Sequence, residues 1–166
     1  MPTLPPSTAK ILAYKVLDRD FDSTWPDWAV DMLAAGFETE HLLILAGMRA
    51  PFDYFEMKTL STKALHELGL DFSDKLQTVF NYVNYFLRMF LDGQSESIKV
   101  LREIRDLYLE LDYEKSLQYF NLLYYAKSDL TVDEEQWYID GVDRNNIEEK
   151  IEVYFKQWLL ETDDQL

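Results

Sequence analysis

The chain has 166 residues, 48% of them hydrophobic, with 10 Phe, 11 Tyr and 4 Trp, a composition that excludes a disordered chain and supplies a hydrophobic core. It has no cysteine, which excludes disulfide bonds, thiolate metal ligands and a cysteine nucleophile. Its 31 acidic side chains outnumber 16 Lys and Arg, and the net charge of -15 disfavours nucleic acid and anionic membranes. Such a surface suits either plain solubility or a basic protein partner.

Glycine and proline mark helix ends along the whole sequence. Each of the five glycines follows a run of apolar residues with helical spacing, and no proline occurs after Pro51. We therefore predict an all-α fold: a single compact domain over residues 1–166 with about eight helices, mostly an antiparallel bundle or a helical array. Residues 1–6 are expected to form a flexible tail, and residues 161–166 a frayed acidic end.

Four helices are expected in the first half of the chain, each after a residue that can cap its N-terminus. Their limits are Ser7 to Leu17, Thr24 to Ala35, Thr39 to Ala46 and Asp53 to Leu68. Asp53 and Glu56 have the spacing of a capping box. In the second helix, Trp28 shares a face with Met32 and is expected to be buried. Trp25 is freer, and is expected to act as a hydrophobic staple or an exposed anchor.

Four more helices are expected in the second half of the chain, on the same grounds of apolar spacing and capping residues. They run from Ser73 to Leu91, from Ser95 to Leu111, from about Tyr113 to Lys127, and onward from Asn145 or Asn146. Residues 128–146 show no helical period and contain Trp137 and Tyr138. A loop of that length inside a compact domain is often functional.

Histidine and carboxylate spacing gives one weak match to a metal-binding pattern. Carboxylate-bridged helical bundles carry Glu-x-x-His on two helices, and Glu38 with His41 is one formal match. His66 follows Lys63 at the same spacing, so the second half of the pattern is missing. Residues 140–146 are rich in oxygen ligands but do not follow the EF-hand order. We therefore predict no metal and no cofactor, with His41 exposed in a first helical turn and His66 on the surface or at a helix end.

The sequence lacks the common catalytic motifs. Its glycines are isolated from one another, so there is no phosphate-binding loop, and it has neither a G-x-S-x-G elbow nor an H-E-x-x-H zinc motif. Acidic residues are spread along the chain, so no carboxylate pair stands out. We predict that the protein is not an enzyme.

Aromatic residues provide the candidates for partner binding. Nine of the eleven tyrosines come after residue 81. Tyrosine and tryptophan combine an apolar body with a polar tip, which serves equally in a half-buried core or at an interface. The side chains that lie off the apolar stripes or in irregular segments are the better interface candidates. They are Trp25, Tyr85, Tyr119, Tyr125, Trp137 and Tyr138.

These observations favour a non-catalytic, acidic, all-helical protein-interaction domain in the cytoplasm, which binds and inhibits a basic protein. In size, acidity and helical content the chain resembles immunity or antitoxin-type inhibitors, without a shared motif. The alternative is a small-molecule-binding protein or an enzyme with a cleft under the Trp137 segment. DNA mimicry is disfavoured because the acidic residues are scattered among Lys and Arg. The sequence does not indicate an oligomeric state.

Overall fold

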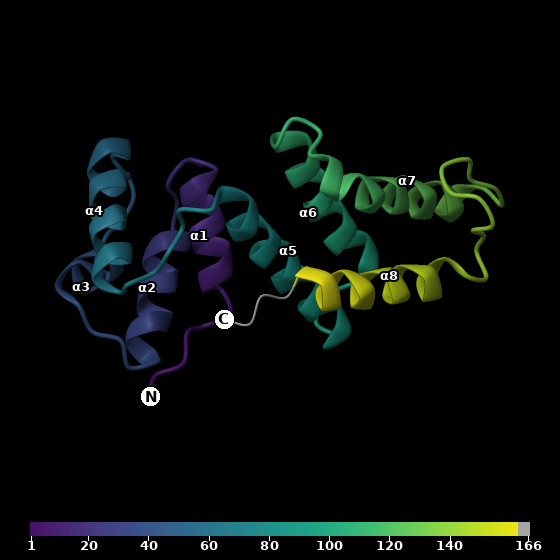
Figure 1. The fold of residues 1–166 in the computed structure, drawn as a ribbon. Helices are drawn as coiled ribbons and strands as arrows, with labels where there is room; N and C mark the ends of the chain where they lie inside the picture. The colour runs from purple at the N-terminus through teal and green to yellow at the C-terminus, as the bar shows by residue number, and fades with distance from the viewer. Residues whose placement is uncertain (163–166) are drawn as a thin grey trace. The chain divides into compact units, whose positions relative to one another are not determined.

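The computed structural model describes residues 1–162, which form eight α-helices, one short 3-10 helix and no strand (Figure 1). The predicted all-α fold class is therefore confirmed. The helices are α1 Thr8–Val16, α2 Thr24–Ala34, α3 Glu40–Ala46, α4 Tyr54–Glu67, α5 Lys75–Leu91, α6 Ser97–Glu110, α7 Gln118–Val132 and α8 Ile147–Thr162, with the 3-10 helix η1 at Lys115–Leu117. None of the helices within residues 1–162 has both the length and the apolar character needed to cross a bilayer.

The chain gathers into two compact units, residues 1–85 (unit 1) and residues 86–166 (unit 2). The division falls inside α5, so the first turns of this helix belong to unit 1 and its last turns to unit 2. Each unit has its own set of buried apolar side chains. The single domain expected over residues 1–166 stays a prediction.

In unit 1, helices α1 to α4 surround a core in which two tryptophans are the largest side chains. Trp28 is 2% exposed, and its indole nitrogen donates a 3.1 Å hydrogen bond to the Thr8 hydroxyl, so its predicted burial is confirmed. Trp25 is only 1% exposed, and the expectation that it lies free is wrong. Its ring packs against Trp28 and against Phe21, which precedes α2 and covers the first turn of that helix.

Aspartate caps the helices of unit 1 more often than the sequence interpretation allowed. Asp53 accepts a 2.8 Å hydrogen bond from the Glu56 amide, as the capping-box spacing predicts. Thr24 is not a cap, because α2 begins at Thr24 itself and Asp22 accepts from its amide. At α5 the predicted cap Ser73 is wrong, since Asp74 accepts from the amide of the third helical residue. A carboxylate forms a stronger bond with the positive end of a helix than a hydroxyl does.

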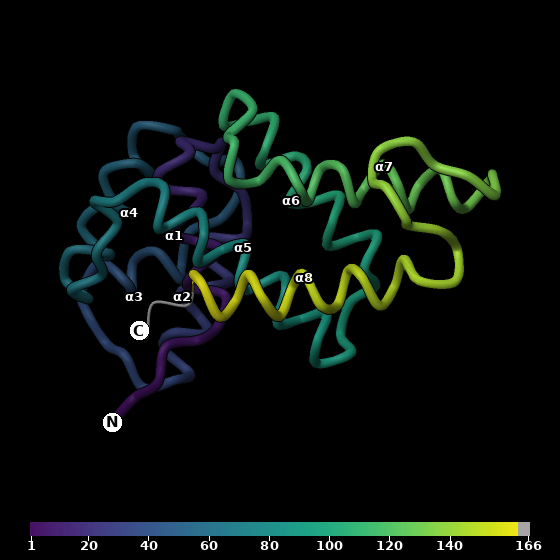
Figure 2. The backbone as a smooth tube through the Cα atoms, turned by 45° about the vertical axis from the view of Figure 1, so that its right-hand side comes forward, coloured from purple at the N-terminus to yellow at the C-terminus, as the bar shows by residue number. Residues whose placement is uncertain are grey.

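In unit 2, helices α7 and α8 run antiparallel. Phe120 at the start of α7 contacts Trp158 near the end of α8, with ring centroids 4.9 Å apart, and Lys127 near the end of α7 forms an ion pair with Glu148 at the start of α8. The tube in Figure 2 shows the chain leaving α7, turning back and returning as the yellow α8. Glu148 also accepts a hydrogen bond from Ser97, so one carboxylate links all three helices α6, α7 and α8.

Helix α7 differs from its predicted range at both ends. It begins at Gln118 rather than near Tyr113, because Asp112 and Tyr113 have positive φ angles that interrupt a helix. It continues to Val132, so the irregular segment starts at residue 133 and not at 128. Leu130 is 5% exposed and extends the buried series of the helix by one more turn.

The starts of α6 and α8 are also corrected. Glu96, not Ser95, precedes the first residue of α6. At α8 the capping residue is Asp143, whose carboxylate accepts from the amides of Asn145 and Asn146. Asn146 accepts in return from the Asp143 amide, which reproduces the reciprocal bonding of a capping box. Helix α8 includes residues 161 and 162, and the rest of the expected frayed end, residues 163–166, lies outside the described residues.

Candidate functional site

The segment between α7 and α8, residues 133–146, is called the connecting loop below, and it presents large aromatic side chains to solvent. Trp137 is 87% exposed and Tyr138 is 44% exposed. Burying a large apolar side chain stabilises a fold by roughly 1.5–3 kcal/mol, and an exposed indole forgoes that contribution. Exposed tryptophan and tyrosine side by side are typical of a surface that is covered when a partner binds.

A buried glutamine organises the backbone of the connecting loop. Gln136 is 9% exposed, and its side-chain oxygen accepts from the amides of Tyr138, at 2.8 Å, and Ile139, at 3.0 Å. Its side-chain nitrogen donates to the carbonyl oxygens of Ile139 and of Val142, the latter at 2.9 Å. A side-chain amide has two donors and an acceptor oxygen, and all of them are used here. The aromatic side chains of the loop therefore stand on an ordered backbone.

Further hydrogen bonds tie the connecting loop to itself and to α7. The Arg144 side chain donates a 2.8 Å hydrogen bond to the Leu130 carbonyl oxygen, one of the last in α7. The Asn146 side-chain nitrogen donates to the Gly141 carbonyl oxygen, also at 2.8 Å. Compact loops held by their own side chains in this way are frequently functional.

Tyr125 extends the aromatic surface from the loop onto α7. Its ring stacks on that of Tyr138, with centroids 5.5 Å apart and planes inclined at 26°. Behind it, the Arg105 guanidinium lies 4.6 Å from the centre of the Tyr124 ring. A hydrogen bond from Arg105 to Tyr125 raises the pKa of Arg105 above its ordinary value, so this cation is fixed against the tyrosine pair.

The connecting loop is strongly acidic as well as aromatic. Residues 133–146 hold five acidic side chains and one basic one, a net charge of -4, and all five acids are exposed. They are Asp133, Glu134, Glu135, Asp140 and Asp143. The one basic residue, Arg144, is turned to the end of α7. The exposed aromatic side chains of the loop therefore belong to a segment with a high density of exposed carboxylates.

The remaining candidates from the sequence are placed elsewhere. Tyr119 lies at the end of α7 opposite the loop and packs on Tyr154 of α8, with ring centroids 4.5 Å apart. Burial and the neighbouring Tyr119 raise the pKa of Tyr154 to about 12, as expected for a ring pair set into the helix packing. Tyr85 belongs to unit 1, where it stacks on Tyr82. Trp25 is buried and its ring is not available to a partner.

Sequence reasoning missed the residues that support the surface rather than form it. Gln136 carries no signal in the sequence, since an isolated glutamine beside exposed residues gives no indication of burial. Arg105 was not among the sequence candidates. Only the packing of α6 against α7 brings it to the tyrosines.

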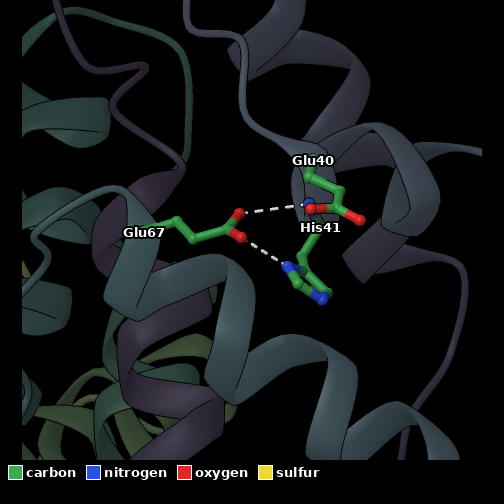
Figure 3. Close-up of side chains that lie close together, drawn as sticks. All are labelled: Glu40, His41 and Glu67. Atoms are coloured by element: carbon green, nitrogen blue, oxygen red, sulfur yellow. Dashed lines mark hydrogen bonds and ion pairs between the residues drawn. The ribbon is translucent and has the colours of Figure 1, made fainter.

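A second cluster joins two helices of unit 1 and contains a histidine. Figure 3 shows Glu67, at the end of α4, reaching His41 at the start of α3. One Glu67 oxygen accepts a 3.1 Å hydrogen bond from the His41 amide, and the other is paired with the His41 ring. These bonds, led by that of the ring, lower the pKa of Glu67. His41 is therefore partly buried and paired, not an exposed residue as predicted, whereas His66 is exposed one residue before the end of α4, as expected.

The same cluster has donor atoms of the kind that bind divalent metals. Glu40, His41 and Glu67 each place one such atom within 4.8 Å of the others, and imidazole with carboxylates suits zinc. The member beside His41 is Glu40, not Glu38, so the Glu-x-x-His pattern is not what forms it. Because both Glu67 oxygens already bind His41, we assign the cluster a structural role as a tie between α3 and α4.

The connecting-loop surface has what non-covalent recognition needs: an ordered backbone, exposed aromatic rings and concentrated charge of one sign. Comparison of the chain with protein-family models, with curated proteins and with solved structures finds no match. The functional interpretation therefore follows from the residues of this surface.

Proposed function

We propose that this chain is a non-catalytic protein-interaction domain whose connecting loop binds a basic protein. The observation that carries the proposal is Trp137, which is 87% exposed on a loop held in shape by the buried Gln136. If this segment were ordered only for stability, burying the indole would stabilise the fold further, as burial of Trp25 and Trp28 does in unit 1.

The negative charge of the loop indicates a positively charged partner surface. Five exposed carboxylates around Trp137 and Tyr138 attract Lys and Arg and steer a basic surface to the loop. The aromatic rings then supply the apolar contact, since tryptophan and tyrosine are enriched among the residues that dominate binding energy. An ordered loop lowers the entropy lost on binding.

Inhibition of the partner on binding stays a prediction, as does a cleft under the Trp137 segment. Two cavities lie in unit 1, and neither is lined by Trp137 or Tyr138. We propose the binding surface because the loop presents exposed aromatic rings and exposed carboxylates.

Parallel affinity capture tests the proposal. The native chain, Trp137→Ala and Leu160→Ala are each used to capture proteins from the native lysate at low and at moderate salt. Leu160 is the matched control, because it is also apolar, 88% exposed and in unit 2, but lies on α8 away from the loop. Removing a binding hot spot weakens an interface by about 2 kcal/mol or more, roughly 30-fold in affinity.

The proposal predicts one basic protein retained by the native chain and by Leu160→Ala, retained less at moderate salt, and lost with Trp137→Ala. Titration of that purified protein with the three variants gives the affinities. Equal retention by all three variants, or capture of acidic proteins only, would contradict the proposal.

A further inference from the structure

Lys15, near the end of α1, is a half-buried lysine whose side-chain nitrogen is held by uncharged oxygens. It donates a 3.1 Å hydrogen bond to the Lys58 carbonyl oxygen and a 2.9 Å hydrogen bond to the Ser61 hydroxyl, both in α4. Within residues 1–162, no carboxylate lies within ion-pair distance of this nitrogen. Lys15 therefore lacks the paired opposite charge that usually accompanies a lysine drawn into a fold.

The contacts of Lys15 match a neutral amine better than an ammonium ion. Ser61 is fully buried, and its hydroxyl donates to the Lys58 carbonyl oxygen at 3.0 Å, so the serine oxygen is left to accept from Lys15. An ammonium group has three N–H donors, whereas a neutral amine has two and a lone pair. The two acceptors in α4 use both donors of the amine. Its lone pair, which makes an amine a nucleophile, then has no partner among the described residues.

The charges around Lys15 favour the same neutral form. Burial, and then the charge of Lys58, lower the pKa of Lys15 to about 8, against a smaller opposing effect of Asp18. Asp18 lies 3.8 Å from the Lys58 nitrogen and also accepts a 2.7 Å hydrogen bond from the Tyr54 hydroxyl. At about pH 7.5, roughly a quarter of the Lys15 side chains are then neutral, against about 0.1% for an ordinary lysine.

The amine of Lys15 lies at the border between the interior and solvent. Its hydrogen bond to the Lys58 carbonyl oxygen is exposed, and its hydrogen bond to Ser61 is partly buried. Lys15 is also one of the residues that line a cavity of about 260 Å³, together with the half-buried rings of Tyr14 and Phe21. The cavity also contacts Arg19, whose guanidinium lies 4.6 Å from the centre of the Tyr14 ring. The space suits an acyl group of a few carbons.

We propose that Lys15 is an acylation site, at which the side-chain amine takes a small acyl group from an acyl thioester. The nitrogen lone pair attacks the thioester carbonyl carbon, so that a C–N bond forms and the C–S bond breaks. The nitrogen gives up one proton, which the leaving thiolate takes. The products are an amide on Lys15 and a free thiol.

The acylated side chain fits its neighbours. An amide keeps one N–H, which can still donate to the Ser61 hydroxyl or to the Lys58 carbonyl oxygen. Acylation also removes the positive charge that Lys58 repels and leaves the pair of Lys58 with Asp18 in place. This site lies in unit 1 and does not depend on the connecting loop, so failure of one proposal leaves the other standing.

The test measures acetylation of the full chain by S-acetyl-N-acetylcysteamine, a small uncharged acetyl thioester. Peptide mass spectrometry gives the acetylated fraction of each lysine with time, from about pH 6.5 to about pH 10. Lys10 is the internal control, because it is also half-buried on α1 and lies 5.5 Å from the Tyr14 ring, but has no hydrogen bond to α4. Free α-N-acetyl-lysine is the reference amine.

Two variants separate the effect of the neighbouring charge from a general effect of charge. Lys58→Gln removes the cation that lowers the pKa of Lys15. Lys63→Gln is its matched control, because it removes the same charge from the same helix but does not line this cavity.

We expect Lys15 to be acetylated about tenfold or more faster than Lys10 at about pH 7.5, because its larger neutral fraction outweighs the lower nucleophilicity of a less basic amine. The Lys15 rate should level off above about pH 8, whereas the rate of the reference amine should rise to about pH 10. Lys58→Gln should slow Lys15 by about twofold or more at about pH 7.5, and Lys63→Gln by less than about 1.5-fold.

Three results would each overturn the proposal. In the first, Lys15 reacts no faster than Lys10. In the second, the Lys15 rate follows that of the reference amine across the whole pH range. In the third, the two lysine variants slow the acetylation of Lys15 equally.

Discussion

The two units use the same residue type in opposite ways. In unit 1, Trp25 and Trp28 are 1% and 2% exposed and form the centre of the core. In unit 2, Trp158 is 7% exposed, but Trp137 is 87% exposed on the connecting loop. The difference follows from the backbone: the buried tryptophans lie on helices whose apolar faces pack inward, whereas Trp137 lies on a segment whose hydrogen bonds are made by a buried glutamine instead.

The comparison shows that an exposed ring indicates a binding surface only when the order of its backbone has no other explanation. Unit 1 also exposes a large ring, since Phe55 on α4 is 76% exposed. That ring lies on α4, and the helix itself, with its cap at Asp53, explains why the backbone there is ordered. The connecting loop is not helical, and the Gln136 side chain holds its backbone through the amides of Tyr138 and Ile139, next to Trp137.

The largest expected effect distinguishes the buried tryptophan from the exposed one. Trp28→Ala should lower the free energy of unfolding by about 3–5 kcal/mol, because it opens a large cavity in the core. Trp137→Ala should change it by less than about 0.5 kcal/mol, since the ring is in water. Urea unfolding measures both, and comparable losses would remove the distinction between the units.

A smaller effect is expected from the glutamine that holds the loop. Gln136→Ala should cost about 1–3 kcal/mol, because it leaves buried backbone groups of the loop without partners. Gln157→Ala is the matched control: this exposed glutamine on α8 bonds to the exposed Glu161, and its loss should cost less than about 0.5 kcal/mol. If the two variants unfold alike in urea, Gln136 does not organise the loop.

Much of the fold follows from apolar spacing, and the corrections have local causes. Leu130 continues the helical spacing of Phe120 and Leu123, so the last turn of α7 could have been predicted from the sequence. Asp112 and Tyr113 in left-handed conformations were not, since neither is a glycine. Asp74 and Asp143 took capping positions from nearby Ser and Asn because several polar residues compete at each helix start.

The candidate surface was predictable only in part. Trp137 and Tyr138 are identified by their place in an irregular acidic segment. Their support is not, because Tyr125 and Arg105 reach the loop through the packing of α6 and α7. Trp25 was misjudged for the same reason: Phe21, from outside the helix, covers it.

Helix capping gives the next smaller effect. Asp53→Ala should destabilise unit 1 by about 1 kcal/mol, because its carboxylate accepts from the Glu56 amide. Ser7→Ala, at the position before α1, should change the stability by less than about 0.5 kcal/mol, since Ser7 makes no side-chain capping bond. Thermal unfolding compares the pair, and an equal change in both would contradict the assignment.

The smallest expected effect is a pH dependence confined to unit 1. The bond from His41 lowers the pKa of Glu67 below its ordinary 4.5. A carboxylate with a lowered folded pKa stabilises the fold above its unfolded pKa, and this stabilisation is lost as the pH falls through the folded value. Glu67→Gln should therefore be less stable than the native chain at neutral pH, and the difference should shrink below about pH 4. A difference in urea unfolding that is constant with pH would show that the ionised carboxylate is not what ties α3 to α4.

The most direct test of the account is amide hydrogen exchange in the connecting loop of the native chain. Tyr138 and Ile139 donate their amides to Gln136, whereas Glu134 and Glu135 lie exposed in the same segment. We predict that the first pair exchanges about tenfold or more slowly than the second, and that Gln136→Ala removes the difference. Equal, fast exchange at all four positions would mean that Trp137 sits on an unordered loop, and the central claim of a preformed binding surface would be wrong.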